Sequence, residues 1–419
     1  MQPRCVLVVG SGGREHALVL ALSRDPAVAE VHAAPGNPGT ALVATNHAVD
    51  IMDGAAVAAL ARELGADLVV VGPEAPLVAG VADAVRAAGT ACFGPSAAAA
   101  RLEGSKAFAK DVMAAAGVPT ARAHVCATAE AAAAALDEFG PPYVVKDDGL
   151  AAGKGVVVTD DRTEALDHAA ACGRVVVEEY LDGPEVSLFA VTDGSCVRAL
   201  QPAQDFKRVG DGDAGPNTGG MGAYTPLPWA PPDLVAEVTA TVLQPTVDEL
   251  ARRGTPFAGL LYAGLALTSR GVKVIEFNAR FGDPETQPLL ARLRTPLAPL
   301  LHAAATGTLA AHPELDWSPD AAVAVVLAAG GYPGPARTGG VIAGLDADAP
   351  DAYVVQAGTA TDSEGRVVGS GGRVLAVVGT GADLSAARES AYARIAAVRL
   401  EGSFYRTDIA AAAATAERS

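Results

Sequence analysis

Short runs of β-branched residues alternate with alanine- and leucine-rich stretches through the first hundred residues of the chain. The runs are typical of buried parallel strands, and the stretches are typical of the helices that join such strands. The strands are expected at residues 5–9, 30–34, 67–71 and 90–93, and the helices at 13–24 and 55–64. This βαβ order predicts an open parallel sheet with helices on both faces.

The pattern changes after a helix that is expected at about 103–116. Strands are then expected in pairs around turns, at 143–146 with 155–159 and at 174–180 with 185–191. These pairs predict a small α+β unit at roughly 118–188. The long polar segment 204–226 is rich in glycine and nearly without periodicity, which is typical of a functional loop.

The rest of the chain predicts two further groups of elements. Helices at about 232–253 and 285–305 enclose strands at 260–268 and 273–278. From about residue 320, strands at 322–327 and 374–378 and a helix at 384–398 predict a third compact unit. At about 150 residues per domain, a length of 419 residues allows two to four domains.

Charge and cysteine content narrow the class of protein. The chain has 48 acidic and 31 basic residues, a net charge of −17, which argues against nucleic acid or a polybasic membrane contact as a partner. Five scattered cysteines without a CxxC pair favour a reducing compartment and argue against a disulfide framework or a structural zinc site. Neither an apolar run of about 18 residues nor a signal peptide is recognised, so a cytoplasmic protein is expected.

The first motif is the glycine-rich turn at residues 10–15, between a strand and a helix. Glycines at a helix N-terminus let the backbone approach an anion. A dinucleotide site would need a third glycine at Glu15 and an acidic residue at the end of the second strand, and neither is present. A smaller phosphate ligand is therefore favoured, with a tight turn that binds nothing as the alternative.

A second glycine-rich segment, at 148–155, resembles a phosphate-binding P-loop only in part. Its spacing is one residue short, and Gly155 stands where Ser or Thr would contact magnesium. A glycine hairpin with Lys154 at its tip can still close over phosphates, while an ordinary hairpin turn is the alternative. Lys146 ends the apolar run before the loop, where a lysine is costly without an anionic partner.

Acidic and basic residues also gather further along the chain. Glu178, Glu179 and Glu185 flank an apolar strand and a turn, where acids are costly without partners. A backbone contact to adenine with a carboxylate on the ribose hydroxyls is one interpretation, and a strand end with solvated acids is the other. Lys207 and Arg208 lie among acids and glycines in the long polar segment, which suits either a substrate-enclosing loop or a disordered linker.

A further pattern follows the apolar strand expected at 273–278. Because alternate residues of a strand face the same way, Glu276, Asn278 and Arg280 share one face. A carboxylate and an amide oxygen are suitable ligands for Mg²⁺, and the arginine can stabilise a transferring phosphoryl group. A half-exposed strand face without a ligand is the alternative, and it would more often carry Thr, Lys or Ser.

Taken together, these motifs resemble the ATP-grasp superfamily of carboxylate–amine ligases, and within it the phosphoribosylamine–glycine ligase family. The similar blocks lie at residues 8–18, 34–37, 71–77, 102–106, 215–224, 276–287 and 369–374, in the family's order along essentially the whole chain. The resemblance implies an α/β and α+β multidomain protein with the ATP-grasp fold. Its expected parts are an N-terminal Rossmann-like domain at 1–102, an ATP-grasp core at 103–320 with a small lid at about 118–188, and a C-terminal domain at 321–419.

The resemblance also implies a reaction. Glycine would be joined to 5-phosphoribosylamine with conversion of ATP to ADP and phosphate, through a glycyl phosphate intermediate, to give glycinamide ribonucleotide in purine biosynthesis. Mg²⁺ or Mn²⁺ would be the cofactor and ATP a co-substrate, and no obligate protein partner is implied. Such chemistry relies on positioning and charge neutralisation, so the lack of a Ser/His/Asp or Cys/His signature is expected.

Roles for individual residues follow from the same resemblance. ATP would be bound by Lys106, Lys146, Gly149, Gly153, Lys154, Gly155, Glu178, Leu181 and Glu185. The metal ligands would be Glu276 and Asn278, and the catalytic residues would be Arg280, Lys207 and Asp205. The substrates would be bound by Gly12, Gly13, Arg14, Glu74, Arg208 and Asp283. Four of the six lysines in the chain thus fall in phosphate or substrate motifs.

Three departures from the family's pattern stand out. Phe206 stands where the family often has histidine, which argues against an acid–base role at that position. Asp147 stands where a small residue is usual, and the connection from Ala165 to Arg174 is short. A ligase for another carboxylate and a non-catalytic nucleotide-binding protein are the alternatives, and the intact phosphate and metal motifs argue against the second.

Overall fold

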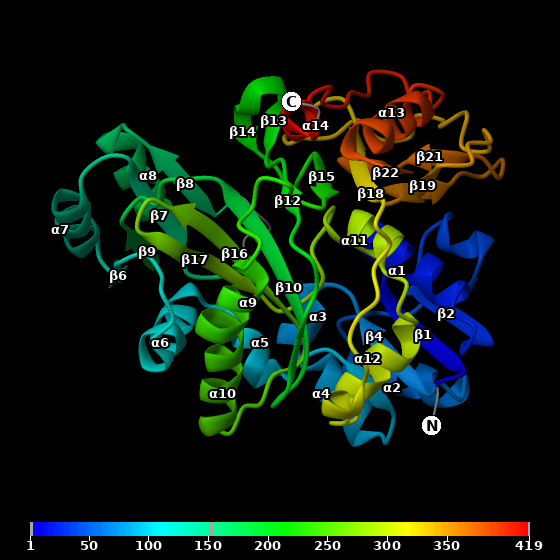
Figure 1. Ribbon diagram of the computed structural model, residues 1–419, viewed down its shortest axis with the longest axis horizontal. Coiled ribbons are helices and arrows are strands. Elements are labelled where there is room, and N and C mark those ends of the chain that lie inside the picture. Colours follow the sequence, from blue (N-terminus) through cyan, green and yellow to red (C-terminus); the bar gives the residue numbers. More distant parts are fainter. Residues whose placement is uncertain (1–2, 151–154, 418–419) are drawn as a thin grey trace.

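The computed structural model describes residues 3–150 and 155–417. Four sheets of four or five strands and two short two-stranded ribbons make up its β-structure. Figure 1 shows the N-terminal sheet on the right, a small sheet on the left, and the strands β10, β16 and β17 between them. Within the described ranges, no helix is long and apolar enough to cross a membrane.

The N-terminal sheet is parallel throughout, as the βαβ pattern predicts. Its strands, in spatial order, are β3 (Thr45–Asn46), β2 (Glu30–Pro35), β1 (Cys5–Gly10), β4 (Leu68–Val71) and β5 (Ala91–Phe93). Its helices are α1 (Gly13–Ser23), α2 (Gly54–Glu63), α3 (Glu74–Val78) and α4 (Val81–Ala87). Because β1 and β4 are neighbouring parallel strands, the turns that lead into α1 and α3 meet at one edge of the sheet.

A small antiparallel sheet follows, covered by two helices. Its strands, in spatial order, are β6 (Ala123–Cys126), β9 (Val175–Glu178), β7 (Tyr143–Asp147) and β8 (Val156–Thr159), and its helices are α7 (Ala129–Phe139) and α8 (Arg162–Cys172). The expected pairing of β7 with β8 is confirmed. The second expected pair is wrong, because β9 pairs with β6 and β7 while β10 lies in the next sheet. The chain passes from the small sheet to the next sheet at Glu179. Ion pairs of Glu179 with Lys273 and Arg122 anchor the chain at this point between the two sheets.

The large central sheet carries most of the predicted chemistry. Its strands, in spatial order, are β11 (Val197–Ala199), β10 (Glu185–Asp193), β16 (Ala258–Thr268) and β17 (Gly271–Asn278). The helices of this part are α5 (Ala97–Gly104), α6 (Lys106–Ala116), α9 (Leu234–Val238), α10 (Gln244–Arg252), α11 (Thr286–Arg292) and α12 (Leu297–Ala305). Two helices expected as single units are broken. Ser105 separates α5 from α6 and caps α6 through its hydroxyl, and Pro296 precedes α12.

The C-terminal sheet combines strands from two distant parts of the chain. Its strands, in spatial order, are β12 (Gln204–Asp205), β15 (Gly222–Thr225), β18 (Ala321–Ala328), β22 (Arg373–Gly381) and β19 (Ala352–Gln356). The other elements here are the ribbons β13 (Arg208–Gly210) with β14 (Ala214–Asn217) and β20 (Thr359–Thr361) with β21 (Val367–Gly369), and the helices α13 (Leu384–Ile395) and α14 (Ala411–Ala416). The expectation of an irregular loop at 204–226 is wrong, because strand β18 supplies hydrogen-bond partners to β15.

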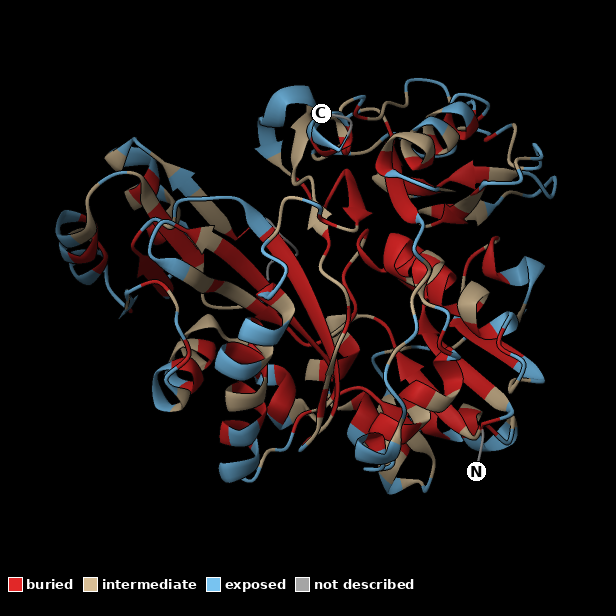
Figure 2. Cartoon of the chain, in the orientation of Figure 1, coloured by how far each residue is buried: buried red, intermediate tan, exposed pale blue. Residues whose placement is uncertain are grey.

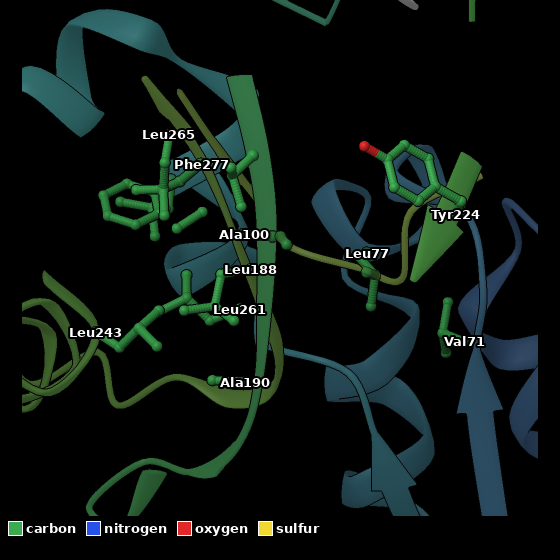
Figure 3. Packing of buried hydrophobic residues seen from close by; sticks show 14 of the residues in the cluster. Val71, Leu77, Ala100, Leu188, Ala190, Tyr224, Leu243, Leu261, Leu265 and Phe277 are labelled. Carbon is green, nitrogen blue, oxygen red and sulfur yellow. The ribbon is translucent and has the colours of Figure 1, made fainter. Parts of the chain in front are cut away.

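One hydrophobic core joins the N-terminal, central and C-terminal parts. Figure 3 shows Val71 and Leu77 of the N-terminal part and Leu188, Leu261 and Phe277 of the central sheet within this core. The small sheet has a separate core. Figure 2 shows that buried residues follow the strands while the exposed residues lie mainly on the outer helix faces and loops. The small sheet is therefore a distinct packing unit attached to a continuous frame.

Candidate active site

The carboxyl end of strand β17 carries the predicted metal pattern. Glu276 is half-buried, Asn278 is 9% exposed, and Arg280 follows the strand. Arg280 makes ion pairs with Glu103 at 3.0 Å and with Glu74 at 3.2 Å. Its Nη2 also lies 3.5 Å from the Oδ1 of Asn278. The arginine is thus held in place by one acid from α3 and one from α5.

The Glu276 carboxylate has no hydrogen bond or ion pair within the described part of the chain. Burial alone would raise its pKa, but Lys207, Lys146 and Lys106 hold the pKa below the usual value of a glutamate. The group is therefore ionised and unpaired, and it stands two residues from the buried amide oxygen of Asn278. This donor set fits the Mg²⁺ or Mn²⁺ that the fold implies, and these two residues would hold the ion.

Glu178, at the end of β9, lies between two buried lysines. The Nζ of Lys146 is 2.9 Å from one carboxylate oxygen, and the Nζ of Lys110 is 3.1 Å from the other. Lys146 also donates to the backbone oxygen of Ile275 at 2.8 Å, which links the small sheet to β17. Burial lowers the pKa of Lys110 to about 8, although Glu178 opposes the shift. Sequence reasoning missed Lys110, yet its place four residues after Lys106 on one helix face was a usable indication.

Lys106, in the first turn of α6, holds one flank of the second glycine-rich segment. Its Nζ donates to the backbone oxygen of Gly149 at 2.9 Å. The neighbouring Asp148 accepts from the Ser105 hydroxyl at 3.0 Å and from the Ala107 N–H at 2.9 Å. The start of the loop is therefore fixed against the N-terminus of α6, where free N–H groups favour an anion.

The remaining predicted ATP residues lie around this loop and the following turn. Gly155 is buried, and its carbonyl accepts from the N–H of Asp147 at 2.7 Å. Leu181 is half-buried in the turn between β9 and β10. Gly153 and Lys154 lie outside the described residues.

Asp205, Lys207 and Glu185 form a charged cluster beside β17. The Nζ of Lys207 is 2.5 Å from a carboxylate oxygen of Glu185. Burial raises the pKa of Asp205 to about 7, and Glu285 and Glu185 add to the rise while Lys207 opposes it. Sequence reasoning missed Glu285, which is 3% exposed and accepts from the hydroxyl of Tyr262 at 2.7 Å. The only sign of Glu285 in the sequence was its place within the block 276–287, which resembles the family.

The N-terminal turns reach the same site through a chain of ion pairs. Glu74, at the start of α3, pairs with Arg280 and lies 3.9 Å from the Nη1 of Arg14. Burial would raise the pKa of Glu74, but the two arginines lower it below its usual value. Arg14 also donates to Glu15 at 2.5 Å. The predicted substrate residues Arg14 and Glu74 are thus connected to the predicted catalytic arginine.

The first glycine-rich turn is filled on one side by protein. The N–H of Gly12 donates to Glu15 at 2.7 Å, and a side chain at Gly10 or Gly12 would collide with that carboxylate. Gly13 is buried and lines a small cavity together with Asp283, whose carboxylate pairs with Arg373 at 3.2 Å. A Cβ added at Gly13 would lie 3.0 Å from the amide nitrogen of Gln287, so this glycine is also closely packed.

Arg208 is not brought to this cluster. It lies on β13, donates to Gly215 of its own ribbon at 2.9 Å, and its carbonyl accepts from Arg406 at 3.0 Å. Arg406 is 2% exposed, and its guanidinium carbon lies 4.8 Å from the ring centre of Phe206. Phe206, the position that departs from the family's pattern, is therefore a packing partner for a buried cation.

These arrangements define a class of protein. The unpaired carboxylate of Glu276 on the central sheet is surrounded by three lysines, which come from α6, from β7 and from the segment after β12. The small sheet, which has its own core, closes one side of this site. Together with the parallel N-terminal sheet, this is an ATP-grasp enzyme.

Family models match nearly the whole chain. The N domain, the ATP-grasp (A) domain and the C domain of phosphoribosylglycinamide synthetase match residues 4–103, 104–286 and 322–412. The chain therefore belongs to the phosphoribosylglycinamide synthetase family. The family resemblance and the fold class expected from the sequence blocks are both confirmed.

Curated relatives and solved structures agree with this assignment. A Streptomyces coelicolor protein named phosphoribosylamine–glycine ligase is 69% identical, over 98% of this chain and 100% of its own length. A Mycobacterium bovis protein with the same name is 60% identical over 98% of both chains. The crystal structure of phosphoribosylamine–glycine ligase from Thermotoga maritima has a TM-score of 0.84 and 33% identity, over 97% of this chain and 100% of that one.

The fold also extends to more distant enzymes. The biotin carboxylase domain of Hydrogenobacter thermophilus 2-oxoglutarate carboxylase, solved in complex with MgADP, has a TM-score of 0.75 at 16% identity. The match covers 97% of this chain and 92% of that one. At this level of identity, the likeness supports the fold alone.

Proposed function

We propose that the chain joins glycine to 5-phosphoribosylamine in an ATP-dependent reaction that yields glycinamide ribonucleotide, ADP and phosphate in de novo purine biosynthesis. Relatives up to 69% identical over their full length carry the name of this activity. The observation that carries the proposal is the unpaired, ionised Glu276 faced by Lys207, Lys146 and Lys106. Such small substrates suit an enzyme of the cytoplasm.

The first step is transfer of the γ-phosphoryl group of ATP to a carboxylate oxygen of glycine. The new P–O bond forms as the bond to the β-phosphate oxygen breaks, which leaves ADP and glycyl phosphate. Lys106, Lys146 and Lys207 neutralise charge on the phosphate oxygens as this happens. Mg²⁺ held by Glu276 and Asn278 would supply further charge stabilisation and orient the phosphates.

The nucleoside end of ATP belongs at the end of β9. Glu178 and the backbone of Leu181 would contact adenine, and Glu185 would accept from the ribose hydroxyls. Glu185 already lies 2.5 Å from Lys207. The ribose must therefore share this carboxylate with the lysine, which couples nucleotide binding to the position of a phosphate-neutralising group.

The second step is attack by the amine of 5-phosphoribosylamine on the carbonyl carbon of glycyl phosphate. The C–N bond forms, the C–O bond to phosphate breaks, and the nitrogen gives up a proton to solvent as phosphate leaves. Arg280, held by Glu74 and Glu103, stabilises the departing phosphate. The amine substrate would bind beside this turn, with Gly12, Gly13, Arg14 and Glu74 as its candidate contacts.

The amino group of glycine needs an acidic pocket while its carboxylate reacts. Asp205 and Glu285 lie in the acidic cluster beside Lys207 and are suited to hold the ammonium. A cation bound there restores the ionised form of Asp205, whose pKa is about 7 without one. The glycine carboxylate would then point toward the lysines and the phosphates.

Phosphate release tests the proposal when each substrate is omitted in turn. We expect release only with ATP, glycine and freshly generated 5-phosphoribosylamine together, and none from Glu276→Gln. Glu364→Gln, which alters an exposed acid of the C-terminal part, is the matched control and should keep wild-type rates. Release that is independent of glycine, or normal rates in Glu276→Gln, would contradict the proposal.

A further inference from the structure

Three common metal-ligating residues meet at the amino-terminal ends of β1 and β2, away from the proposed active site. Cys5 begins β1, Glu30 begins β2, and His32 lies two residues further along β2. The strand register sets Cys5 opposite Glu30, so alternation directs all three side chains to one face of the sheet. The cysteine sulfur, a carboxylate oxygen and a ring nitrogen lie within 4.8 Å of one another. Figure 1 marks the N-terminus, which lies near the start of β1.

His32 is the member of the cluster that points to a ligand. The residue is 9% exposed, and its Nε2 has no hydrogen-bond partner among the described residues. The nearest carboxylate oxygen, on Glu30, is 3.6 Å away, which is too long for a hydrogen bond. A buried polar atom without a partner costs about 1–3 kcal/mol, and folded proteins rarely leave one. A bound cation would satisfy this nitrogen.

His47 holds the other nitrogen of the same ring. The Nδ1 of His32 lies 3.0 Å from the Nε2 of His47, in the residue that follows β3. When Nδ1 donates this hydrogen bond, Nε2 carries a free lone pair, which is the usual arrangement of a metal-ligating histidine. Burial and His47 lower the pKa of His32, although Glu30 opposes them, so the ring is neutral at pH 7.

We propose that Cys5, Glu30 and His32 bind a divalent metal ion of the zinc class, with His47 orienting the histidine. Thiolate sulfur, imidazole nitrogen and carboxylate oxygen together favour zinc over magnesium. A tetrahedral zinc ion sets nitrogen and oxygen ligands about 3.4 Å apart, close to the 3.6 Å separation of Glu30 and His32. The Glu30 side chain is 69% exposed, so water can complete the coordination.

Binding exchanges a proton for a metal–sulfur bond. Burial, Glu30 and Asp67 raise the pKa of Cys5, so the free thiol is protonated at pH 7. The metal displaces that proton to solvent as the sulfur–metal bond forms. The site would clamp β1 to β2 at the sheet edge opposite the proposed active site, so it would affect stability rather than turnover.

This proposal departs from the sequence-based expectation that the chain has no structural zinc site. That exclusion rested on the lack of a CxxC pair, but pairing of parallel strands brings together ligands that are 25 residues apart in the chain. It does not depend on the proposed function, because none of the ligands belongs to the active site.

Metal titration of the full-length chain without a polyhistidine tag tests the inference. Excess Mg²⁺ is kept present so that the oxygen site at Glu276 is occupied, and Co²⁺ then reports the ligands by its spectrum. We expect one Co²⁺ per chain with a thiolate-to-metal charge-transfer band, and displacement of Co²⁺ by Zn²⁺. Cys5→Ser should abolish the band, while Cys196→Ser, which changes another half-buried cysteine, should retain it.

Two further variants keep the test decisive if Cys5→Ser fails to fold. Glu30→Gln alters an exposed side chain and should lower zinc affinity at least tenfold, and His47→Gln should lower it by about 10–100-fold through loss of ring orientation. Metal-free melting curves check that both variants fold. The inference is overturned if no thiolate band forms, if the band survives Cys5→Ser, or if folded Glu30→Gln binds zinc as the wild type does.

Discussion

Replacing Arg280 by methionine separates the stabilising role of this residue from its catalytic role. Within the described part of the chain, Arg280 is the sole cation paired with Glu103, whose side chain is 8% exposed. The other carboxylate oxygen of Glu103 accepts from the N–H of Ala279 at 2.7 Å. Burial raises the pKa of Glu103 even though Arg280 opposes it, so this carboxylate depends on its one ionic partner.

The expected loss of stability follows from that burial. Removing one partner of a buried ion pair costs about 3–5 kcal/mol, because the remaining charge is unpaired. For a domain of about 200 residues, this corresponds to a fall of roughly 6–20 °C in the unfolding midpoint. Protonation of Glu103 relieves part of the cost. Since its pKa is raised by folding, that relief is present at low pH and is lost as pH rises, so the fall should be larger at pH 8 than at pH 6.

A second substitution completes the test. In the double variant Arg280→Met with Glu103→Gln, the amide oxygen can still accept from Ala279, position 103 carries no charge and Glu74 keeps Arg14, so most of the midpoint should return. Turnover should not return, because no guanidinium faces the phosphate. Scanning fluorimetry at both pH values and phosphate release measure the two effects. A wild-type midpoint for Arg280→Met at pH 8, or turnover in the double variant, would refute the reasoning.

Three further predictions concern the surroundings of the site. Glu178→Gln should lower the unfolding midpoint, because Lys110 and Lys146 lose the acid that they share. Lys110→Met should change the midpoint little, because burial already disfavours the charge of this lysine. Equal midpoints for the two variants at pH 7 would contradict this prediction. In the wild type, kcat/KM for glycine should fall about tenfold per pH unit below pH 7 as Asp205 is protonated. Asp205→Asn should remove this slope, and an unchanged profile would argue against contact with glycine. Arg406→Met should expose the β13–β14 ribbon to limited proteolysis, because Arg406 pairs with an acid in the turn of this ribbon. The control Arg366→Met, which changes an exposed arginine, should not have this effect. Mass spectrometry of the fragments locates the cleavage site.

Sequence reasoning succeeded where a local pattern determines both the element and its chemistry. The β-branched runs of the N-terminal sheet pair in parallel, as expected from their spacing. The β7–β8 hairpin and the long strands β16 and β17 also lie close to their expected positions. In the hairpins, neighbouring segments supply the partners, and in the parallel sheet the buried apolar runs mark each strand, so periodicity identifies the elements.

Sequence reasoning failed where the pairing partner of a residue comes from a distant segment of the chain. The polar segment 204–226 has no periodicity of its own, yet β15 pairs with β18 about a hundred residues later. The ion pair of Lys110 was overlooked because its partner Glu178 lies 68 positions away, and the helical spacing from Lys106 does not reveal that partner. Only folding brings such groups within reach of one another.

What the sequence by itself determined is the family, the ATP-grasp architecture and the alternation that sets Glu276 and Asn278 on one face of a strand, whereas Arg280 lies beyond the end of that strand. What only the tertiary structure decided is the electrostatic state of these groups. Three lysines from separate elements keep Glu276 ionised, and two acids from α5 and α3 hold Arg280. The physical reason is that charge–charge energies in a partly buried site depend on distance and burial in space, which a linear order of residues does not contain.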